Sequence, residues 1–165
     1  MQPKLINFSV NGKSIGLLFL LISMICLGAC SPKHSSYSNF VHIKDGEWVK
    51  KQACEFVPIY TDSASLIDVK IAFCYEHKYP FRNISLVVDF VKNDSIVKRV
   101  ETDFDLVDAS GNKLTSGFGV AYQADKIIAQ SVNVVDFDKI RVWHGLENDT
   151  LNYITSVGVI ITPCE

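Results

Sequence analysis

The residues with the clearest chemistry in this sequence lie around Cys30. The run Leu27-Gly28-Ala29-Cys30 matches the lipobox, a pattern in which the cysteine thiol receives a diacylglyceryl group before a signal peptidase cuts in front of it. We therefore expect cleavage between Ala29 and Cys30 and a lipid on the Cys30 thiol. An ordinary signal peptide with a chance cysteine and an uncleaved anchor are the alternatives.

The segment before Cys30 has the order of an export signal. Lys4 and Lys13 come first, the apolar run from Ile15 to Cys26 follows, and small residues precede the cysteine. This apolar run is shorter than the ~20 residues that a helix needs to cross a bilayer. Residues 1–29 are thus predicted to be a lipoprotein signal peptide. Several acyl chains on Cys30 would hold the rest of the chain stably at a membrane.

The sequence offers no convincing pattern for hydrolysis or phosphate binding. The run Ser116-Gly117-Phe118-Gly119 is not a nucleophile elbow, because its serine precedes both glycines and no helix is predicted after it. The same glycine pair lacks the strand-to-helix context of a phosphate loop. Relief of a bulge or of a close backbone approach within a strand explains these glycines better. We expect neither an enzyme nor a bound cofactor.

A row of acidic residues could at first suggest a cation site. Its members are Glu101, Asp103, Asp105 and Asp108. Alternate positions of a strand share one face, so this spacing is typical of a solvated strand face, whereas calcium needs six or more converging oxygens. The histidines are scattered without a zinc-binding spacing, at His34, His42, His77 and His144. No metal site is predicted.

Three cysteines follow Cys30, namely Cys54, Cys74 and Cys164. Export permits disulfides, and Cys54 and Cys74 fall in consecutive predicted strands that could bring them face to face. The alternative is that both are buried as free, small apolar side chains.

Two features bear on small-molecule and nucleic-acid partners. Trp48, Trp143 and Tyr153 could line a ligand groove, or they could serve as core and strand-edge aromatics. The chain has 18 acidic against 16 basic residues, and loss of Lys4 and Lys13 with the signal would make the remainder more acidic. A nucleic-acid partner needs a basic surface and is therefore not expected.

The chain after the signal divides into two parts. Residues up to about Asp45 are mostly polar, with little to bury, and predict a lipidated tether over residues 30–45. Residues 46–165 form a single predicted domain, in which apolar residues alternate with polar ones and no helical period is sustained.

The alternation is clearest in two stretches of this domain. Val69 to Tyr75 and Ile84 to Phe90 each place every second apolar side chain on one face. Further strands are predicted at 54–60, 96–107, 117–123, 127–135, 140–144 and 154–162, with turns at 92–95 and 108–112. A helical turn is an alternative for residues 124–130. The prediction is an all-β fold, a single antiparallel β-sandwich of about eight strands.

Four segments resemble, in order, the GldH gliding motility lipoproteins of the Bacteroidetes. The segments are Tyr79-Pro80-Phe81-Arg82-Asn83-Ile84, residues 106–114, residues 116–119 and residues 151–159. With the lipobox and the strand at Trp48, the resemblance covers nearly all of the chain after Cys30. One departure is the run at residues 143–148, where an expected His-x-Met-Arg pattern lacks its methionine and arginine. If that arginine contacts a partner in the family, the contact is in doubt here.

The resemblance implies a non-catalytic outer-membrane lipoprotein that serves the gliding or an associated secretion machinery through contacts with other envelope proteins. No acidic cluster of the kind that marks surface-exported lipoproteins in these bacteria follows Cys30, so we expect the domain to face the periplasm. A lipid-anchored sandwich that binds glycans or other small ligands is the alternative.

Arg82 and Asn83 are the candidate partner contacts. They stand between Phe81 and Ile84, where a strand with a buried face is predicted to begin. A structural role is the alternative, in which Asn83 bonds the backbone of its own turn and Arg82 bridges to the acidic face of a neighbouring strand.

Overall fold

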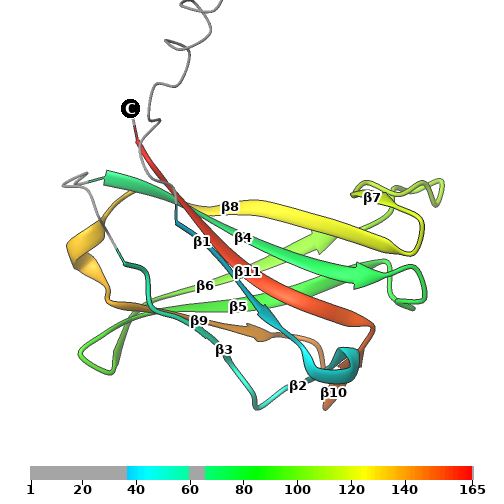
Figure 1. Cartoon of the computed structure of the whole chain (residues 1–165), viewed down its shortest axis with the longest axis horizontal. Coiled ribbons are helices and arrows are strands. Elements are labelled where there is room, and N and C mark those ends of the chain that lie inside the picture. Colours follow the sequence, from blue (N-terminus) through cyan, green and yellow to red (C-terminus); the bar gives the residue numbers. More distant parts are fainter. Residues whose placement is uncertain (1–36, 60–65, 165) are drawn as a thin grey trace, which may run out of the picture. The chain divides into compact units, whose positions relative to one another are not determined.

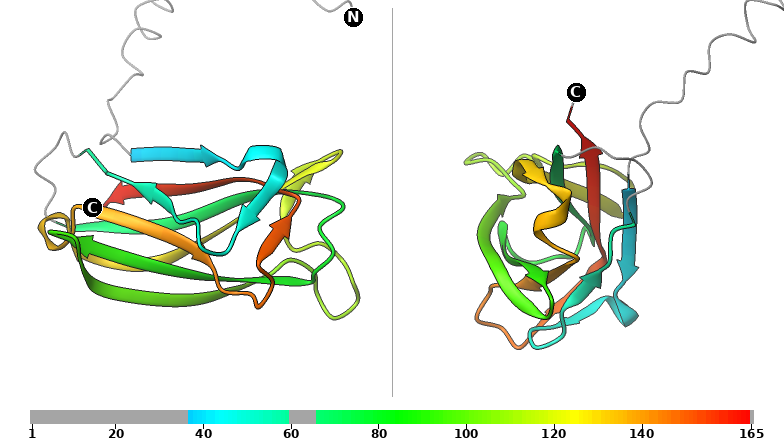
Figure 2. Two further views of the ribbon diagram at one scale, coloured as in Figure 1. Left: turned by 90° about the horizontal axis from the view of Figure 1, so that it is seen from below. Right: turned by 90° about the vertical axis from the view of Figure 1, so that its left-hand side faces the viewer.

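A computed structural model describes residues 37–59 and 66–164 of the chain. Its strands are all paired antiparallel and form two larger sheets and one small one, which confirms the predicted all-β sandwich (Figures 1 and 2). The first sheet has the order β1-β11-β4-β8-β7. Its strands are β1 (Tyr37–His42), β4 (Leu66–Glu76), β7 (Ser116–Phe118), β8 (Ala121–Asn133) and β11 (Ile154–Pro163).

The second sheet packs against the first and has the order β3-β9-β5-β6. Its strands are β3 (Cys54–Phe56), β5 (Asn83–Lys92), β6 (Ser95–Asp105) and β9 (Lys139–His144). A short ribbon pairs β2 (Glu47–Val49) with β10 (Thr150–Asn152), and the two 3-10 helices are η1 (Lys44–Gly46) and η2 (Val134–Asp136). No helix in the described part of the chain has the length and hydropathy of a membrane-spanning segment.

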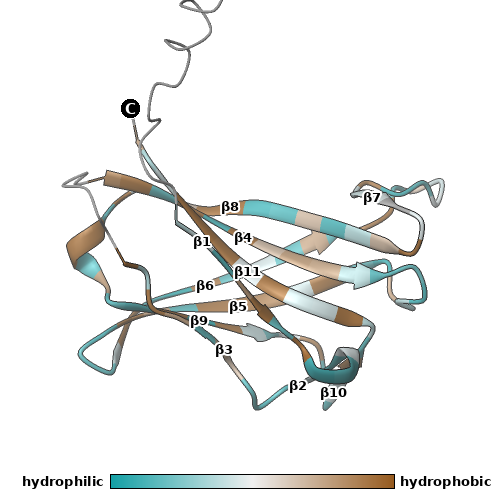
Figure 3. Cartoon of the chain, viewed as in Figure 1, coloured by the Kyte–Doolittle hydropathy of each residue, from teal (hydrophilic) through white to brown (hydrophobic). Residues whose placement is uncertain are grey.

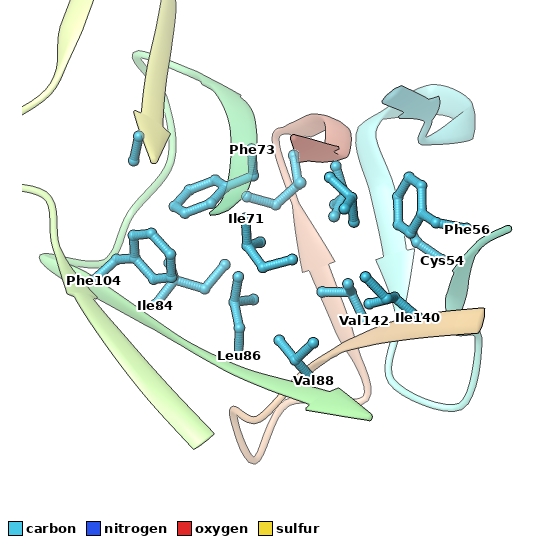
Figure 4. Packing of buried hydrophobic residues seen from close by; sticks show 14 of the residues in the cluster. Cys54, Phe56, Ile71, Phe73, Ile84, Leu86, Val88, Phe104, Ile140 and Val142 are labelled. Atoms are coloured by element: carbon cyan, nitrogen blue, oxygen red, sulfur yellow. The ribbon is translucent and has the colours of Figure 1, made fainter. Parts of the chain in front are cut away.

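The core forms where the alternating apolar faces of β4 and β5 meet. The inward side chains from Val69 to Tyr75 and from Ile84 to Phe90 are all buried, as their sequence pattern predicts. Rings from opposite sheets touch directly, with 5.1 Å between the ring centroids of Phe73 and Phe104 (Figure 4). Full burial of such a side chain contributes about 1.5–3 kcal/mol, so these two strands supply much of the driving force for folding.

The domain begins earlier in the chain than the sequence analysis expects. Residues 37–42, inside the expected tether, form β1 and pair with β11 from Tyr37 opposite Ile161 to His42 opposite Ser156. β1 is an edge strand whose residues are largely exposed, with only Tyr37 and Val41 packed against the core. β1 is held to the sheet by main-chain hydrogen bonds, which require no alternation of apolar residues. Its sequence therefore cannot be distinguished from that of a polar tether.

Three other elements differ from the sequence prediction. β3 ends at Phe56 rather than at residue 60, and β8 is a strand from Ala121 to Asn133, including residues 124–130, for which a helical turn is the alternative. The predicted strand at 117–123 is in fact the β7–β8 hairpin, which turns at Gly119 with a φ of +66°. A positive φ suits glycine, and the chain reverses there.

The strand directions give the sandwich two distinct ends. We call the end where β1 and β4 begin and β11 finishes the entry end; the β5–β6 turn and η2 lie there too. At the opposite end, which we call the loop end, residues 77–82 join β4 to β5, residues 106–115 join β6 to β7, and residues 119–120 join β7 to β8 (Figure 1).

Candidate interaction surface

The loop end gathers three of the four segments on which the family resemblance depends. Residues 79–84, 106–114 and 116–119 are separated in sequence, but the strand order brings them to the same end of the sandwich (Figure 1). The fourth segment begins beside them, because the carbonyl of Tyr153 accepts a hydrogen bond from the amide of Glu76 at 2.9 Å.

Main-chain hydrogen bonds hold these three loops to one another. The amide of Leu106 donates to the carbonyl of Arg82 at 2.8 Å, and the amide of Leu114 donates to the carbonyl of Leu106 at 3.0 Å. The amide of His77 donates to the carbonyl of Val120 at 2.9 Å. Because each loop is bonded to another loop or strand end, the loop end is an ordered surface and not a set of independent turns.

Asp108 organises the longest of these loops. Its carboxylate accepts hydrogen bonds from the amide of Asn112 at 2.8 Å and from the side-chain Nδ2 of Asn112 at 2.9 Å. These bonds to Asn112 lower the pKa of the Asp108 carboxyl. Gly111 provides the positive φ of +88° at which the turn reverses. Asp108 is thus a turn residue with a local partner, not part of an acidic binding cluster.

Beneath the loops lies a stack of aromatic rings. Tyr75 stacks on Tyr122 with 5.6 Å between ring centroids, and Tyr79 meets Tyr75 edge-on at 5.7 Å. Lys113 places its Nζ 3.6 Å from the centroid of the Tyr122 ring, and the Tyr75 hydroxyl lies 2.6 Å from Thr115 Oγ1. Burial raises the pKa of Tyr79, so its hydroxyl stays protonated. The stack joins the loop end to the core.

Above this stack the loop end exposes apolar side chains beside a cation. Phe81, Leu114 and Val120, one from each loop, are exposed to solvent, and Arg82, which follows Phe81, is exposed as well. Exposed apolar and aromatic side chains together with an arginine form the composition that protein interfaces favour.

The two candidate contact residues lie at this surface. The Arg82 guanidinium donates to the main-chain carbonyl of Asp108, so it contacts the backbone of the 106–115 loop and not the acidic strand face that the structural alternative invoked. Asn83 begins β5 opposite Asp105, its side chain is exposed, and its carbonyl accepts a hydrogen bond from the Tyr79 hydroxyl at 3.3 Å. Cys30 and Ala29 lie outside the described residues.

The suggested disulfide between Cys54 and Cys74 is not formed, because both are free thiols. Cys54 points into the core from β3 (Figure 4), where burial raises the pKa of its thiol to about 12. Cys74 lies on the outer face of the other sheet, with its Sγ 4.0 Å from Gln123 Oε1. Strand alternation therefore directs the two thiols to different surfaces.

The remaining candidates do not assemble into a site. Glu101, Asp103 and Asp105 are exposed along β6, as the solvated-face interpretation predicts. Trp48 is buried and meets His144 edge-on at 5.4 Å, so it is a core residue. Among the described residues, no group of three His, Cys, Asp or Glu side chains could hold a metal ion.

Sequence reasoning missed a charged row on the outer face of the second sheet. Glu55, Arg141, Asp89 and Arg99 lie opposite one another across β3, β9, β5 and β6. Asp89 is only 1% exposed and accepts from Arg99 Nε at 2.6 Å, from Arg99 Nη2 at 2.8 Å and from Trp143 Nε1 at 3.1 Å. Arg99 chiefly lowers the pKa of this carboxyl.

The three aromatic residues considered for a ligand groove lie apart from one another. Trp143 turns outward to bond Asp89, Trp48 is in the core and Tyr153 lies near the loop end, each in a different environment. The only sequence signal for the row was Asp89 itself, an acid within an apolar strand.

A family model described as "GldH lipoprotein" matches residues 35–161 of the chain. No curated protein matches the sequence. Two solved structures from infectious bursal disease virus, one of the Gx strain and one of the VP2 subviral particle, share 9% identity with it. Their TM-scores are 0.33 and 0.35, and the matches cover 81% and 80% of this chain. The chain spans only about a third of those viral chains, with 35% and 33% covered, and so low a likeness bears on neither fold nor function.

Proposed function

Because the chain belongs to the GldH lipoprotein family, we propose that it is a non-catalytic outer-membrane lipoprotein that serves the gliding or an associated secretion machinery through protein contacts. In this proposal, cleavage after Ala29 leaves a lipid on Cys30, and the domain faces the periplasm. The family description names a lipoprotein and supports the membrane anchor.

The observation that carries the contact role is the convergence of the family segments at the loop end. There the loops are bonded to one another, and they expose Phe81, Leu114 and Val120 as well as Arg82. The chain enters the sandwich at the opposite end, so an anchor before Tyr37 leaves the loop end free to meet a partner.

The alternative of glycan binding has weaker support. Sugar recognition favours exposed aromatic rings in a shared groove, and the three aromatics considered for that role lie apart. The cleft between β6 and β8, about 430 Å³ in volume, is lined mainly by polar residues such as Asp103, Asp105 and Lys126.

Affinity purification from crosslinked envelopes tests the contact role. We expect a tagged chain carrying Leu114→Asp and Val120→Asp to lose the envelope proteins that the unchanged chain recovers, because a charge at an apolar contact is costly to desolvate. A control variant carries Ile127→Asp, a change at an exposed aliphatic residue in the middle of β8, away from both ends of the sandwich. Equal recovery by both variants would refute the role of the loop end.

Metabolic labelling tests the anchor separately. Cells given an alkyne fatty acid should label the unchanged chain and leave Cys30→Ala unlabelled, with its precursor accumulating. Undiminished label on Cys30→Ala would refute lipidation at this residue.

Protease added to intact cells tests which side of the membrane the domain faces. It should leave the domain uncut unless the cells are permeabilised, and cleavage in intact cells would place the domain on the cell surface.

A further inference from the structure

The entry end carries exposed aliphatic side chains from several elements. They come from the segment after β3, from the start of β4, from the start of β6 and from η2: Val57, Ile59, Leu66, Ile96, Val97 and Val135. Figure 3 shows hydrophobic colouring at the start of β4 and in the η2 segment at this end. Exposed apolar side chains gathered in one region mark a contact surface more often than scattered ones do.

Hydrogen bonds fix these elements to one another. The amide of Asp138 donates to the carbonyl of Val91 at 2.9 Å, and the amide of Asn93 donates to Asp138 Oδ2 at 3.0 Å. Lys92 Nζ donates to the carbonyl of Val135. The β5–β6 turn and η2 are therefore fixed to each other at the entry end.

A cleft of about 400 Å³ extends this apolar surface inward. Phe90, Val97, Val132 and Phe137 line it, and Lys98 and Asp136 complete its lining. The lysines of the entry end contact groups within the fold. Lys139 Nζ lies 3.8 Å from Asp94 Oδ1 and 3.6 Å from Glu55 Oε2, and Lys98 Nζ lies 5.7 Å from the centroid of the Phe90 ring.

The course of the chain indicates what covers this surface. Tyr37 begins β1 at the entry end, and Cys30 precedes it by only seven positions. A fully extended chain of that length reaches at most about 25 Å. A lipid on Cys30 would therefore hold the aliphatic side chains of the entry end close to a lipid surface, where even weak partitioning is effective because the attachment is intramolecular.

We propose that the entry end docks on the lipid bilayer, with Ile59, Val97 and Val135 in its interfacial region, so that the sandwich stands with its loop end away from the membrane. This inference rests on the anchor at Cys30 in the proposed function. It adds an orientation that a flexible attachment alone would not produce.

Two matched valines allow a direct test. Val135 at the entry end and Val120 at the loop end are both 63% exposed. The full-length lipidated chain is prepared with Val135→Trp or with Val120→Trp and reconstituted in vesicles of phosphatidylethanolamine and phosphatidylglycerol with brominated acyl chains. The native Trp48 and Trp143 are present in both variants, and unchanged thermal melting shows that each variant is folded.

We expect the added fluorescence of Val135→Trp to be largely lost in brominated vesicles, at low and high salt alike, and that of Val120→Trp to be retained. Equal quenching of the two variants, or quenching of Val120→Trp alone, would overturn the orientation while leaving the anchor intact. A chain that does not float with the vesicles would overturn the anchor, and the orientation with it.

Discussion

The two ends of the sandwich expose apolar side chains in different settings. At the loop end, three loops that are joined over a stack of tyrosine rings expose Phe81, Leu114 and Val120, and Arg82 is exposed there too. At the entry end, the exposed apolar side chains are aliphatic, and the lysines contact groups within the fold. The same fold can thus present one end suited to a protein and another suited to lipid, because the loops that join its strands differ in composition.

The largest expected effect is the loss of stability when the buried ring of Tyr79, which links the loop end to the core, is removed. Tyr79 is buried, and its ring contacts both Tyr75 and Phe81. Removing a buried aromatic side chain costs about 3–5 kcal/mol, so Tyr79→Ala should lower the free energy of unfolding by that order. Urea denaturation of the purified protein measures it. At the entry end, Val135→Ala should change the free energy of unfolding by no more than about 0.5 kcal/mol. Similar losses in Tyr79→Ala and Val135→Ala would contradict the difference in core attachment between the two ends.

The second prediction concerns the sheet between the two ends. Asp89→Asn leaves Arg99 and Trp143 without their carboxylate, and a hydrogen bond to a charged group contributes about 1.5–3 kcal/mol. Because the folded state lowers the pKa of Asp89 below its ordinary 3.8, the stability that its charge provides is present above that pH and lost as pH falls through the folded pKa. Unfolding at neutral and acidic pH should therefore show a smaller acid loss in Asp89→Asn than in the unchanged chain. An identical loss of stability at acidic pH in both proteins would show that the Asp89 carboxylate does not stabilise the fold.

The third prediction uses His144, which is buried near the β2–β10 ribbon against Trp48. Neither of its ring nitrogens has a hydrogen-bond partner, and burial first, then Lys50, lowers its pKa below 6.5. The unfolded chain therefore binds the proton more tightly, so stability should decline as pH falls below 6.5 toward the folded pKa. His144→Leu should reduce this slope of the urea midpoint. An equal slope in His144→Leu and in the unchanged chain would exclude His144 as the cause.

The smallest expected change in stability is that of Arg82→Ala. Its guanidinium is exposed and donates to one carbonyl, so the loss should be about 1 kcal/mol or less and the melting temperature should move by only a few degrees. Recovery of envelope partners should fall much more, because arginines at interface centres can contribute about 2 kcal/mol or more to binding. Both are measured on the same purified variant. A large drop in melting temperature would make Arg82 a scaffold residue instead.

The sequence predicts those parts of the fold that depend on apolar alternation. β4 and β5 could be found because their inward side chains repeat at every second position, whereas β1 could not, since an exposed edge strand is held by main-chain bonds. That residues 79–84 and 106–114 meet at one end of the sandwich could not be predicted either, because it depends on the order of the strands in the sheets.

The charged row around Asp89 shows a subtler limit. Two residues with positive φ, Asn93 and Asp94, form the turn that the sequence predicts between Lys92 and Ser95. Uninterrupted pairing from that turn would set Asp89 opposite Lys98, but a bulge after Phe90 shifts the register and brings Arg99 there instead. A bulge has no reliable signal in a single sequence, so the ion pair emerges only from the structure.

Site-specific photo-crosslinking in living cells tests most directly whether the loop end is the contact surface. A benzophenone amino acid replaces Val120 in one strain and the equally exposed Val135 in another, and adducts are separated on denaturing gels after irradiation. We expect discrete protein adducts with envelope components from position 120 and none from position 135. Protein adducts from position 135 with none from position 120 would show that the loop end is not the contact surface.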